Sequence, residues 1–313
     1  MTAKLSVVLG GAGFLGSHVT EALLARGHRV RVFDREHVDL RNLQHLEGDW
    51  EFVGGDLGSV SDQERAVEGS SSLFHLVSTT IPATSNQDPA FDVETNLLAT
   101  VRLLERARQM RMERFVFVSS GGTVYGRPER IPIPEDHPTE PLVSYGVVKL
   151  AVEKYLHLYH HLYGLPYSVV RLSNPYGPRQ RAGGAQGAAS VFLARVHAGK
   201  PIEIWGDGGV VRDYIFVSDA VEGIRAAHDR SGPSGTDTIG SGAGTSLTDL
   251  VAAIGEVTGR QVDVRYTPGR AFDVPANVLD ISRARRELGW TPRTDLHEGL
   301  RRTWAWLDED ARS

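Results

Sequence analysis

The feature that most constrains the fold is a glycine-rich turn at residues 10–16, Gly-Gly-Ala-Gly-Phe-Leu-Gly. It follows an apolar run over residues 5–9 and opens an amphipathic segment that continues to Ala25. The order predicts a buried strand, a tight turn and a helix start. We expect Gly10 to adopt a turn conformation that other residues rarely reach, Gly13 to let the main chain approach a ligand, and Gly16 to let the helix pack closely on the strand.

A strand, a glycine turn and a helix N-terminus together present backbone N–H groups to an anion such as a dinucleotide pyrophosphate. The spacing is G-x-x-G-x-x-G instead of the commoner G-x-G-x-x-G, so the turn alone is also compatible with an ordinary loop. The next apolar run ends at Asp34, whose carboxylate can accept both ribose hydroxyls of an adenosine and repel a 2′-phosphate. This favours NAD, although the adjacent Arg35 could pair with a 2′-phosphate and leaves NADP open.

Composition removes several classes of function. The chain has 313 residues, no cysteine and a formal net charge of −5 at pH 7. Disulfides, thiolate metal sites and cysteine nucleophiles are therefore excluded, and the acidic balance argues against a nucleic-acid partner. No segment has the length and apolarity of a membrane span, so we expect a cytoplasmic enzyme without a membrane partner. We expect no metal site, because His157, His160 and His161 share a helix face without further ligands at a set spacing.

Strand-like apolar runs alternate with helical patterns through the first half of the chain. Strands are expected near residues 51–53, 73–77, 115–118 and 167–172, and the clearest helices at 91–110 and 145–163. This predicts an α/β fold, a Rossmann-type doubly wound parallel sheet with helices on both faces and a ligand crevice beyond the strand ends. After Leu172 the alternation breaks. We expect residues 1–175 plus about 211–240 to form an NAD-binding domain, and about 176–210 and 241–313 to form a smaller C-terminal α/β substrate lobe.

Tyr145 and Lys149 are four residues apart at the start of a helical pattern, which puts both side chains on one face. An ammonium beside a phenol stabilises the phenolate and lowers its pKa, so the pair can take a proton from a sugar alcohol. Lys149 could also bond a nicotinamide ribose. A serine- and glycine-rich strand end at residues 118–126 offers a hydroxyl that could share a hydrogen bond with the substrate and Tyr145. The alternatives are a helix-surface pair and a simple strand-end turn.

These motifs and several later ones occur in an order that resembles the extended short-chain dehydrogenase/reductases, in particular the NAD-dependent nucleotide-sugar epimerases of the UDP-glucose 4-epimerase type. The later motifs are Gly55-Asp56-Leu57, Asn174-Pro175-Tyr176-Gly177-Pro178-Arg179, Gly206-Asp207-Gly208 leading to Arg212-Asp213-Tyr214, Arg270-x-x-Asp273 and Leu288-Gly289-Trp290. The resemblance covers essentially the whole chain. It implies an isomerase that inverts C4 of a nucleotide-diphosphate hexose, with a UDP-sugar expected, through a transient 4-keto intermediate.

The resemblance also implies roles for individual residues. Tyr145 would be the base, Lys149 its partner and Ser120 the catalytic hydroxyl, with Thr123 as the fallback. The cofactor would contact Gly10, Gly13, Phe14, Leu15, Gly16, Asp34, Arg35, Asp56, Leu57, Leu76, Ser78, Asn96, Tyr145 and Lys149. The substrate would contact Thr79, Thr123, Asn174, Arg179, Arg212, Arg270 and Asp273.

Departures from the family pattern narrow the reaction. Many members carry the catalytic hydroxyl where this chain has Gly121, whereas some epimerases place it immediately before a Gly-Gly pair, which corresponds to Ser120. The related 4,6-dehydratases use an Asp-Glu pair where this chain has Gly122 and Thr123, and the fucose-synthase branch uses a cysteine. Elimination therefore favours 4-epimerisation.

Other functions stay open at this point. One alternative is an NAD(P)-dependent nucleotide-4-keto-sugar reductase or dehydratase of the same fold, and a more distant one is an NAD-sensing binding protein. The resemblance further implies a homodimer that pairs through the helices at 91–110 and 145–163. The sequence leaves the sugar open among glucose, N-acetylglucosamine and glucuronate, and the nucleotide open between UDP and dTDP.

Overall fold

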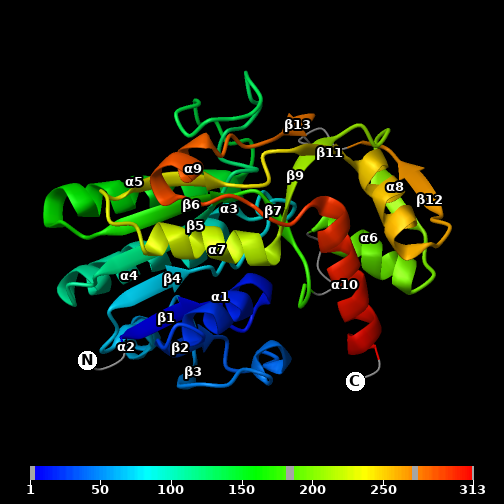
Figure 1. The fold of residues 1–313 in the computed structure, drawn as a ribbon. Helices are drawn as coiled ribbons and strands as arrows, with labels where there is room; N and C mark the ends of the chain where they lie inside the picture. Colours follow the sequence, from blue (N-terminus) through cyan, green and yellow to red (C-terminus); the bar gives the residue numbers. More distant parts are fainter. Residues whose placement is uncertain (1–3, 181–186, 270–273, 312–313) are drawn as a thin grey trace.

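The core of the molecule is a seven-stranded sheet whose paired strands all run parallel, in the order β10-β6-β5-β4-β1-β2-β3 (Figure 1). The computed structural model describes residues 4–180, 187–269 and 274–311. Strand order reverses between β1 and β4, which opens a crevice beyond their carboxyl ends. The strands are β1 (Leu5–Leu9), β2 (Arg29–Asp34), β3 (Trp50–Gly54), β4 (Ser72–His75), β5 (Arg114–Ser120), β6 (Tyr167–Leu172) and β10 (Gly235–Ile239).

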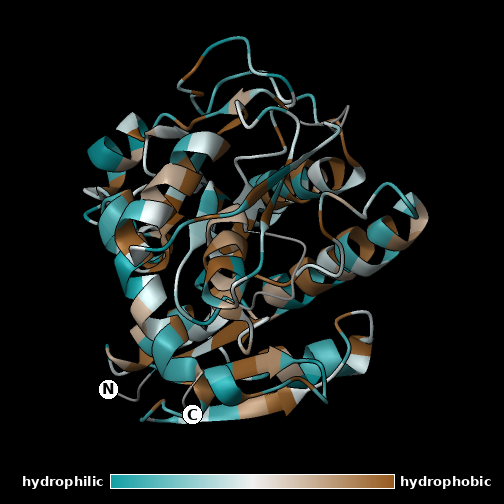
Figure 2. Ribbon diagram, turned by 90° about the vertical axis from the view of Figure 1, so that its right-hand side faces the viewer, coloured by the Kyte–Doolittle hydropathy of each residue, from teal (hydrophilic) through white to brown (hydrophobic). Residues whose placement is uncertain are grey.

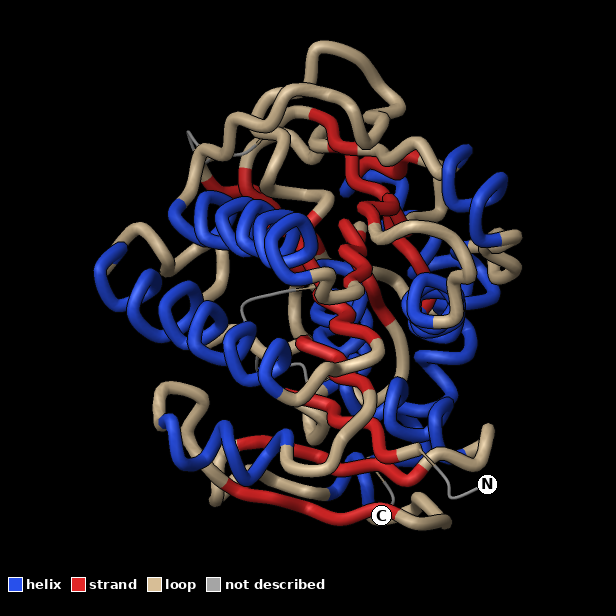
Figure 3. Tube along the Cα trace, turned by 90° about the vertical axis from the view of Figure 1, so that its left-hand side faces the viewer, coloured by secondary structure: helices blue, strands red, loops and turns tan. Residues whose placement is uncertain are grey.

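Helices cover both faces of this sheet (Figure 3). Side chains alternate between the faces along each strand, so Val8 joins the cluster under α1 (Phe14–Leu24) and α7 (Val217–His228). Its neighbour Val7 joins the cluster under α2 (Val60–Val67), α4 (Ala99–Gln109) and α5 (Ser144–Tyr163). Continuous apolar strands are therefore buried on both sides, and the predicted doubly wound Rossmann-type fold is confirmed.

The two long helices of the sequence pattern differ in regularity. The segment expected to be helical at 91–110 consists of α3 (Pro89–Asp92), a π-helical turn η2 (Val93–Leu98) and α4. The second is continuous as α5 and ends at Gly164, whose φ of 70° is the left-handed conformation that closes many helices. A short 3₁₀ turn, η1 (Arg41–Leu43), follows β2. None of the described helices is long and apolar enough to cross a membrane.

Much of the second half of the chain builds a smaller lobe, which lies beside the sheet in Figure 1 and toward the viewer in Figure 2. Strand β9 (Val211–Phe216) belongs to a second, smaller sheet. It pairs there with β7 (Asn174–Tyr176), β11 (Gly244–Ser246) and β13 (Ala276–Asn277), and not with a strand of the large sheet. A separate parallel pair joins β8 (Ile202–Trp205) to β12 (Val264–Thr267). Besides α7, which covers the large sheet, the helices after β7 are α6 (Ala188–His197), α8 (Leu247–Thr258), α9 (Ser282–Leu288) and α10 (Leu296–Asp310). Of these, α9 packs against β10 and α7.

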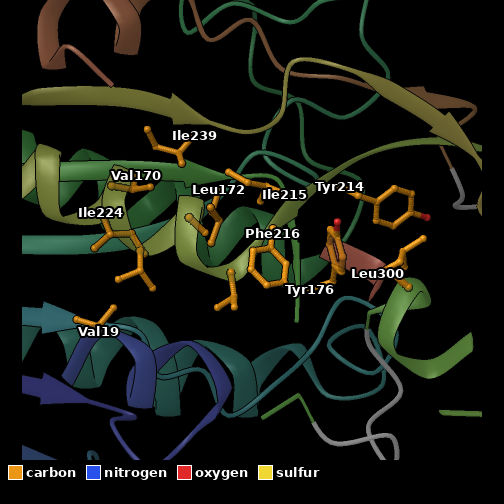
Figure 4. Packing of buried hydrophobic residues seen from close by; sticks show 14 of the residues in the cluster. Val19, Val170, Leu172, Tyr176, Tyr214, Ile215, Phe216, Ile224, Ile239 and Leu300 are labelled. Carbon is orange, nitrogen blue, oxygen red and sulfur yellow. The ribbon is translucent and has the colours of Figure 1, made fainter. Parts of the chain in front are cut away.

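One hydrophobic cluster runs through both lobes (Figure 4). Tyr176 and Phe216 meet edge to face with ring centroids 5.8 Å apart, and the Tyr176 hydroxyl donates to the carbonyl oxygen of Leu296 at 3.2 Å. A Cβ at Gly299 of α10 would lie 2.1 Å from that hydroxyl, so the close packing requires glycine. The shared core fixes the small lobe against the carboxyl edge of the sheet.

Candidate active site

The backbone of the glycine turn is packed so closely that side chains would not fit at two of its glycines. Gly10 has a φ of +77°, and a Cβ on Gly16 would lie 2.1 Å from the carbonyl oxygen of Gly10. Helix α1 begins directly after Gly13, whose position offers no side-chain cap, and its first turn holds no acidic residue. The first N–H groups of this helix are therefore suited to an anionic ligand.

Asp34 ends β2 beside this turn. Its Oδ2 accepts a hydrogen bond from the backbone N–H of Ala12 at 3.2 Å, and its Oδ1 accepts one from the N–H of Arg35 at 2.9 Å. The side chain is only partly buried. An uncapped helix start with an adjacent strand-end carboxylate fits a dinucleotide with its pyrophosphate on α1 and its ribose facing Asp34.

The remaining residues predicted to hold the cofactor lie along the same edge. Asp56 accepts a hydrogen bond from the N–H of Gly58 at 2.8 Å, and Leu57 is buried. Leu76 and Ser78 follow β4, where the backbone of Val77 packs on Gly10 and the Ser78 hydroxyl donates to the carbonyl oxygen of Thr80 at 3.0 Å. Their individual roles stay predictions.

Tyr145 and Lys149 lie together at the start of α5, as their spacing predicts. The ammonium of Lys149 is 5.5 Å from the centre of the Tyr145 ring and 4.7 Å from that of Phe117. It donates to the carbonyl oxygen of Val118 on β5 at 3.0 Å, which anchors it to the carboxyl end of the strand. Both side chains line a small cavity, whose other lining residues are His75, Val77, Ser78, Asp92, Asn96, Thr100, Phe117, Val148 and Val152.

The pKa of Tyr145 is raised, whereas the spacing from Lys149 predicted that it would be lowered. Burial, together with the charge of Asp92, raises the pKa of Tyr145 to about 12. Burial lowers the pKa of Lys149 to about 8, against the opposing effects of Asp92 and Glu153. Proximity to Lys149 alone therefore does not bring the pKa of Tyr145 toward neutrality, because desolvation of the phenolate dominates.

The strand end at β5 distinguishes the two candidate hydroxyls. Ser120 is the last residue of β5 and is partly exposed. The Thr123 hydroxyl is buried and has no hydrogen-bond partner among the described residues. A Cβ on Gly121 would lie 2.5 Å from Cδ1 of Leu279, so a larger residue at 121 would require the Leu279 side chain to move. Ser120 remains our predicted catalytic hydroxyl.

Several buried polar residues near the pair were missed from the sequence. Asp92 lies four residues before Asn96 and accepts a hydrogen bond from its side-chain amide at 2.9 Å. Glu153 lies four residues after Lys149 and pairs with Arg171 on β6 at 2.7 Å. The i,i+4 spacing was a signal for both, but only the fold shows that these charges are buried. His75 ends β4 and gave no such signal; burial lowers its pKa to about 3.

The residues predicted to bind substrate lie on several segments, on β7, on β9 and in the loop after β4. The Asn174 amide donates to the backbone of Asp213 at 2.9 Å, and Arg212 on β9 donates to the carbonyl oxygen of Val274 at 2.7 Å. Thr79 is exposed beside Asn96, whose Oδ1 accepts its backbone N–H at 2.9 Å.

Arg179 forms an ion pair with Glu21 of α1 at 2.6 Å, which couples the segment after β7 to the first helix of the sheet. Its predicted contact with substrate stays a prediction. Arg270 and Asp273 lie outside the described residues.

Known proteins resemble this chain over nearly its whole length. A model of the NAD dependent epimerase/dehydratase family matches residues 6–239. The chain belongs to this family. It is 37% identical over 307 residues to a UDP-glucose 4-epimerase of Mycolicibacterium smegmatis, covering 95% of this chain and 96% of that protein. It is 33% identical over 308 residues to a putative UDP-glucose 4-epimerase of Methanocaldococcus jannaschii, covering 98% and 99%.

Solved structures of this family share the fold. The structure of the Thermotoga maritima UDP-glucose 4-epimerase with UDP-glucose superposes with a TM-score of 0.93 at 34% identity, covering 98% of this chain and 99% of that one. The Thermus thermophilus UDP-glucose 4-epimerase, in complex with NAD, gives a TM-score of 0.90 at 34% identity, covering 97% and 99%. Among the residues described for the present chain, no group of three or more His, Cys, Asp or Glu side chains is arranged to hold a metal ion.

Proposed function

We propose that the chain is an NAD-dependent epimerase that inverts C4 of a UDP-hexose through a 4-keto sugar. The observation that carries the proposal is that Tyr145 and Lys149 line one cavity at the carboxyl edge of the sheet, the edge that also carries the glycine turn. The similarity of the whole chain to UDP-glucose 4-epimerases supports the same reaction.

The proposed mechanism assigns proton transfer to Tyr145. Its phenolate takes the proton of the C4 hydroxyl. Because Lys149 alone does not lower the pKa of Tyr145 enough, the ammonium of Lys149 and the positive charge of bound NAD would together favour that phenolate. Ser120 donates a hydrogen bond to the reacting oxygen. Bound NAD would supply the oxidation at C4 and the return reduction on the opposite face, so net redox change is zero. After the keto sugar turns within the site, Tyr145 returns the proton.

The cofactor would lie across the switch point between β1 and β4. Gly10, Gly13 and Gly16, with Phe14 and Leu15 at the start of α1, would hold the pyrophosphate, and Asp34 would accept the adenosine ribose hydroxyls. Asp56 and Leu57 would flank the adenine.

Because α7 and β10 belong to the layers of the large sheet whereas β9 belongs to the small sheet, we place the start of the second segment of the cofactor-binding domain after β9, near residue 217.

The substrate nucleotide would lie between the lobes. Asn174 and Arg212, from β7 and β9, are suited to its phosphates, and binding of this remote part would retain the loosened keto sugar. The M. smegmatis and T. maritima relatives are UDP-glucose 4-epimerases, which favours UDP and glucose for this chain. Bacillus cereus UDP-glucuronic acid 4-epimerase, a structure with a TM-score of 0.89 at 26% identity, keeps glucuronate as a second candidate sugar.

A cofactor-free assay tests the proposal. The purified protein is mixed with UDP-glucose, UDP-N-acetylglucosamine, UDP-glucuronate and dTDP-glucose in separate reactions, without added NAD, and C4 inversion is followed by proton NMR. We expect equilibration of at least one pair of C4 epimers. Absence of inversion for all of them, in protein that carries NAD, contradicts the proposal.

One relative favours a second function. A dTDP-4-dehydro-6-deoxyglucose reductase of Escherichia coli is 29% identical over 306 residues. A reductase consumes one NAD(P)H per turnover, whereas the epimerase needs none added. Turnover of a 4-keto sugar that stops without NAD(P)H and resumes with it would assign this chain to the reductases.

We also propose a homodimer that pairs through α3–η2–α4 and α5. Large apolar side chains are exposed along these helices, including Phe91, Leu98, Val147 and Leu162 at 41–55% exposure. Such a patch is typical of a buried interface. Light scattering tests this directly, and a monomeric mass would contradict it. The cytoplasmic location stays a prediction from the sequence.

A further inference from the structure

We infer that Asp92 is a positioning residue of this active site, whose buried carboxylate fixes the start of α5 and presents a negative charge to Tyr145 and Lys149. The inference rests on the proposed function, because it concerns the residues assigned there to proton transfer. Asp92 ends α3, is fully buried and lines the same cavity as that pair.

The hydrogen bonds of Asp92 join three separate segments. Its Oδ2 accepts from the hydroxyl of Ser144 at 2.7 Å, and Ser144 immediately precedes Tyr145. Its Oδ1 accepts from the hydroxyl of Thr80, after β4, at 2.7 Å and from the amide of Asn96, on η2, at 2.9 Å. The first turn of α5 is thereby tied to the π-helical turn and to the loop after β4. A group that holds a catalytic side chain in this way restricts it to one geometry.

The charge of Asp92 is not balanced by its own hydrogen-bond donors, which are all uncharged. Glu153, the other carboxylate close to Lys149, is already paired with Arg171 at 2.7 Å. His75, on β4, faces the same cavity and is neutral, because burial lowers its pKa to about 3. Lys149 is the cation that lines this cavity together with Asp92. Among the described residues, the ionisable side chains that line the cavity are His75, Asp92, Tyr145 and Lys149, and the Glu153–Arg171 pair adjoins Lys149.

The direction of the effect follows from the sign of the charge. A nearby carboxylate favours the ammonium of Lys149 and disfavours the phenolate of Tyr145, so it raises the pKa of both. Removal of the charge should lower both pKa values. The two limbs of a bell-shaped pH–rate profile would then move in the same direction, toward acid. Loss of packing alone would lower the rate without moving either limb.

Asp92→Asn tests the charge with little change in shape. The chain has lysine only at positions 4, 149, 154 and 200, so ¹³Cε-lysine NMR of the isolated protein can follow Lys149 directly, assigned with Lys149→Met. We expect the pKa of Lys149 to fall by about one unit and both limbs of kcat/KM to shift to lower pH. An unchanged Lys149 titration overturns the inference.

Ser144→Ala tests the positioning separately, because it keeps the charge and removes only the hydrogen bond to Asp92. We expect kcat to fall roughly tenfold with the limbs unmoved and KM nearly unchanged. An unaltered kcat overturns the positioning role, including in the case where Asp92→Asn does not fold.

Asp219→Asn is the matched control. Asp219 is also a buried carboxylate, and it accepts hydrogen bonds from the backbone N–H groups of Arg293 and Thr294 at 3.0 and 2.8 Å. This variant should leave the Lys149 titration and both limbs in place, and a shift equal to that of Asp92→Asn overturns the inference. Wild-type protein that epimerises no nucleotide sugar would refute the proposed function, while the NMR titration would still decide the effect of Asp92 on Lys149.

Discussion

Glu153 and Arg171 form an ion pair of 2.7 Å whose side chains are 5% and 7% exposed, and Glu153 lies one helical turn after the proposed catalytic Lys149 on α5. Glu153 also accepts a hydrogen bond from the Ser119 hydroxyl at 2.5 Å, and Arg171 donates to the Tyr125 hydroxyl at 3.0 Å. The pair thus ties α5 to β5, β6 and the loop after β5, on which the geometry of the site depends.

Glu153→Gln should lower the free energy of unfolding by about 3 kcal/mol, because it leaves the Arg171 guanidinium buried without its counter-charge. Urea denaturation measures the loss. The double variant Glu153→Gln/Arg171→Met should recover most of it. Glu113→Gln is the control. It breaks an ion pair with Lys4 in which both side chains are more than half exposed, so it should lower the free energy of unfolding by less than about 1 kcal/mol. Equal losses for the buried and exposed pairs would contradict the prediction.

Tyr145→Phe should reduce kcat by about 10³-fold or more while the protein still binds NAD, because only the phenolic proton acceptor is lost. The assay is C4 inversion by NMR, with bound NAD measured after denaturation of the protein. Tyr266→Phe, an exposed tyrosine on β12, should keep full activity. A Tyr145→Phe variant with wild-type turnover would remove Tyr145 from the mechanism.

Gly16→Ala should destabilise the protein and abolish NAD binding, because its Cβ would lie 2.1 Å from the carbonyl oxygen of Gly10 and force the turn apart. Gly255→Ala is a matched control in another helix, since its Cβ would meet its nearest neighbour at an ordinary 3.7 Å. That control should gain up to about 1 kcal/mol of stability from helix propensity. Thermal unfolding and NAD titration distinguish the two. An NAD affinity unchanged in Gly16→Ala would refute the role of the turn.

His75 should make the protein less stable in acid. Burial lowers its pKa from 6.5 to about 3, so below pH 6.5 the unfolded chain binds a proton that the folded chain does not. The unfolding free energy should therefore fall as the pH drops from about 6.5 toward 3, by up to about 1.4 kcal/mol per unit from this group.

His75→Gln removes that contribution, so its stability should depend less steeply on pH than that of the wild type in urea titrations at pH 7, 6, 5 and 4. His18, whose pKa burial lowers to about 4, acts in the same direction and keeps part of the slope. A slope for His75→Gln equal to that of the wild type would show that His75 is not the group responsible.

Much of the site could be predicted because its signals are local. The glycine turn, Asp34 at a strand end and the Tyr145–Lys149 spacing each depend on neighbours within one strand or one helical turn. The helix at 91–110 was found, but its π-helical turn was not, since nothing in the periodicity marks the widened turn that carries Asn96.

Sequence by itself determined the alternation of strands and helices, the glycine turn and the pairing of a phenol with an ammonium, because each follows from residue type and short spacing. Only the tertiary structure decided how charged these groups are and what surrounds them. Asp92 reaches Ser144 across 52 positions of sequence, and Leu279 fills the space beside Gly121. Desolvation raises or lowers a pKa according to everything packed around the group, and that packing arises only when distant segments meet.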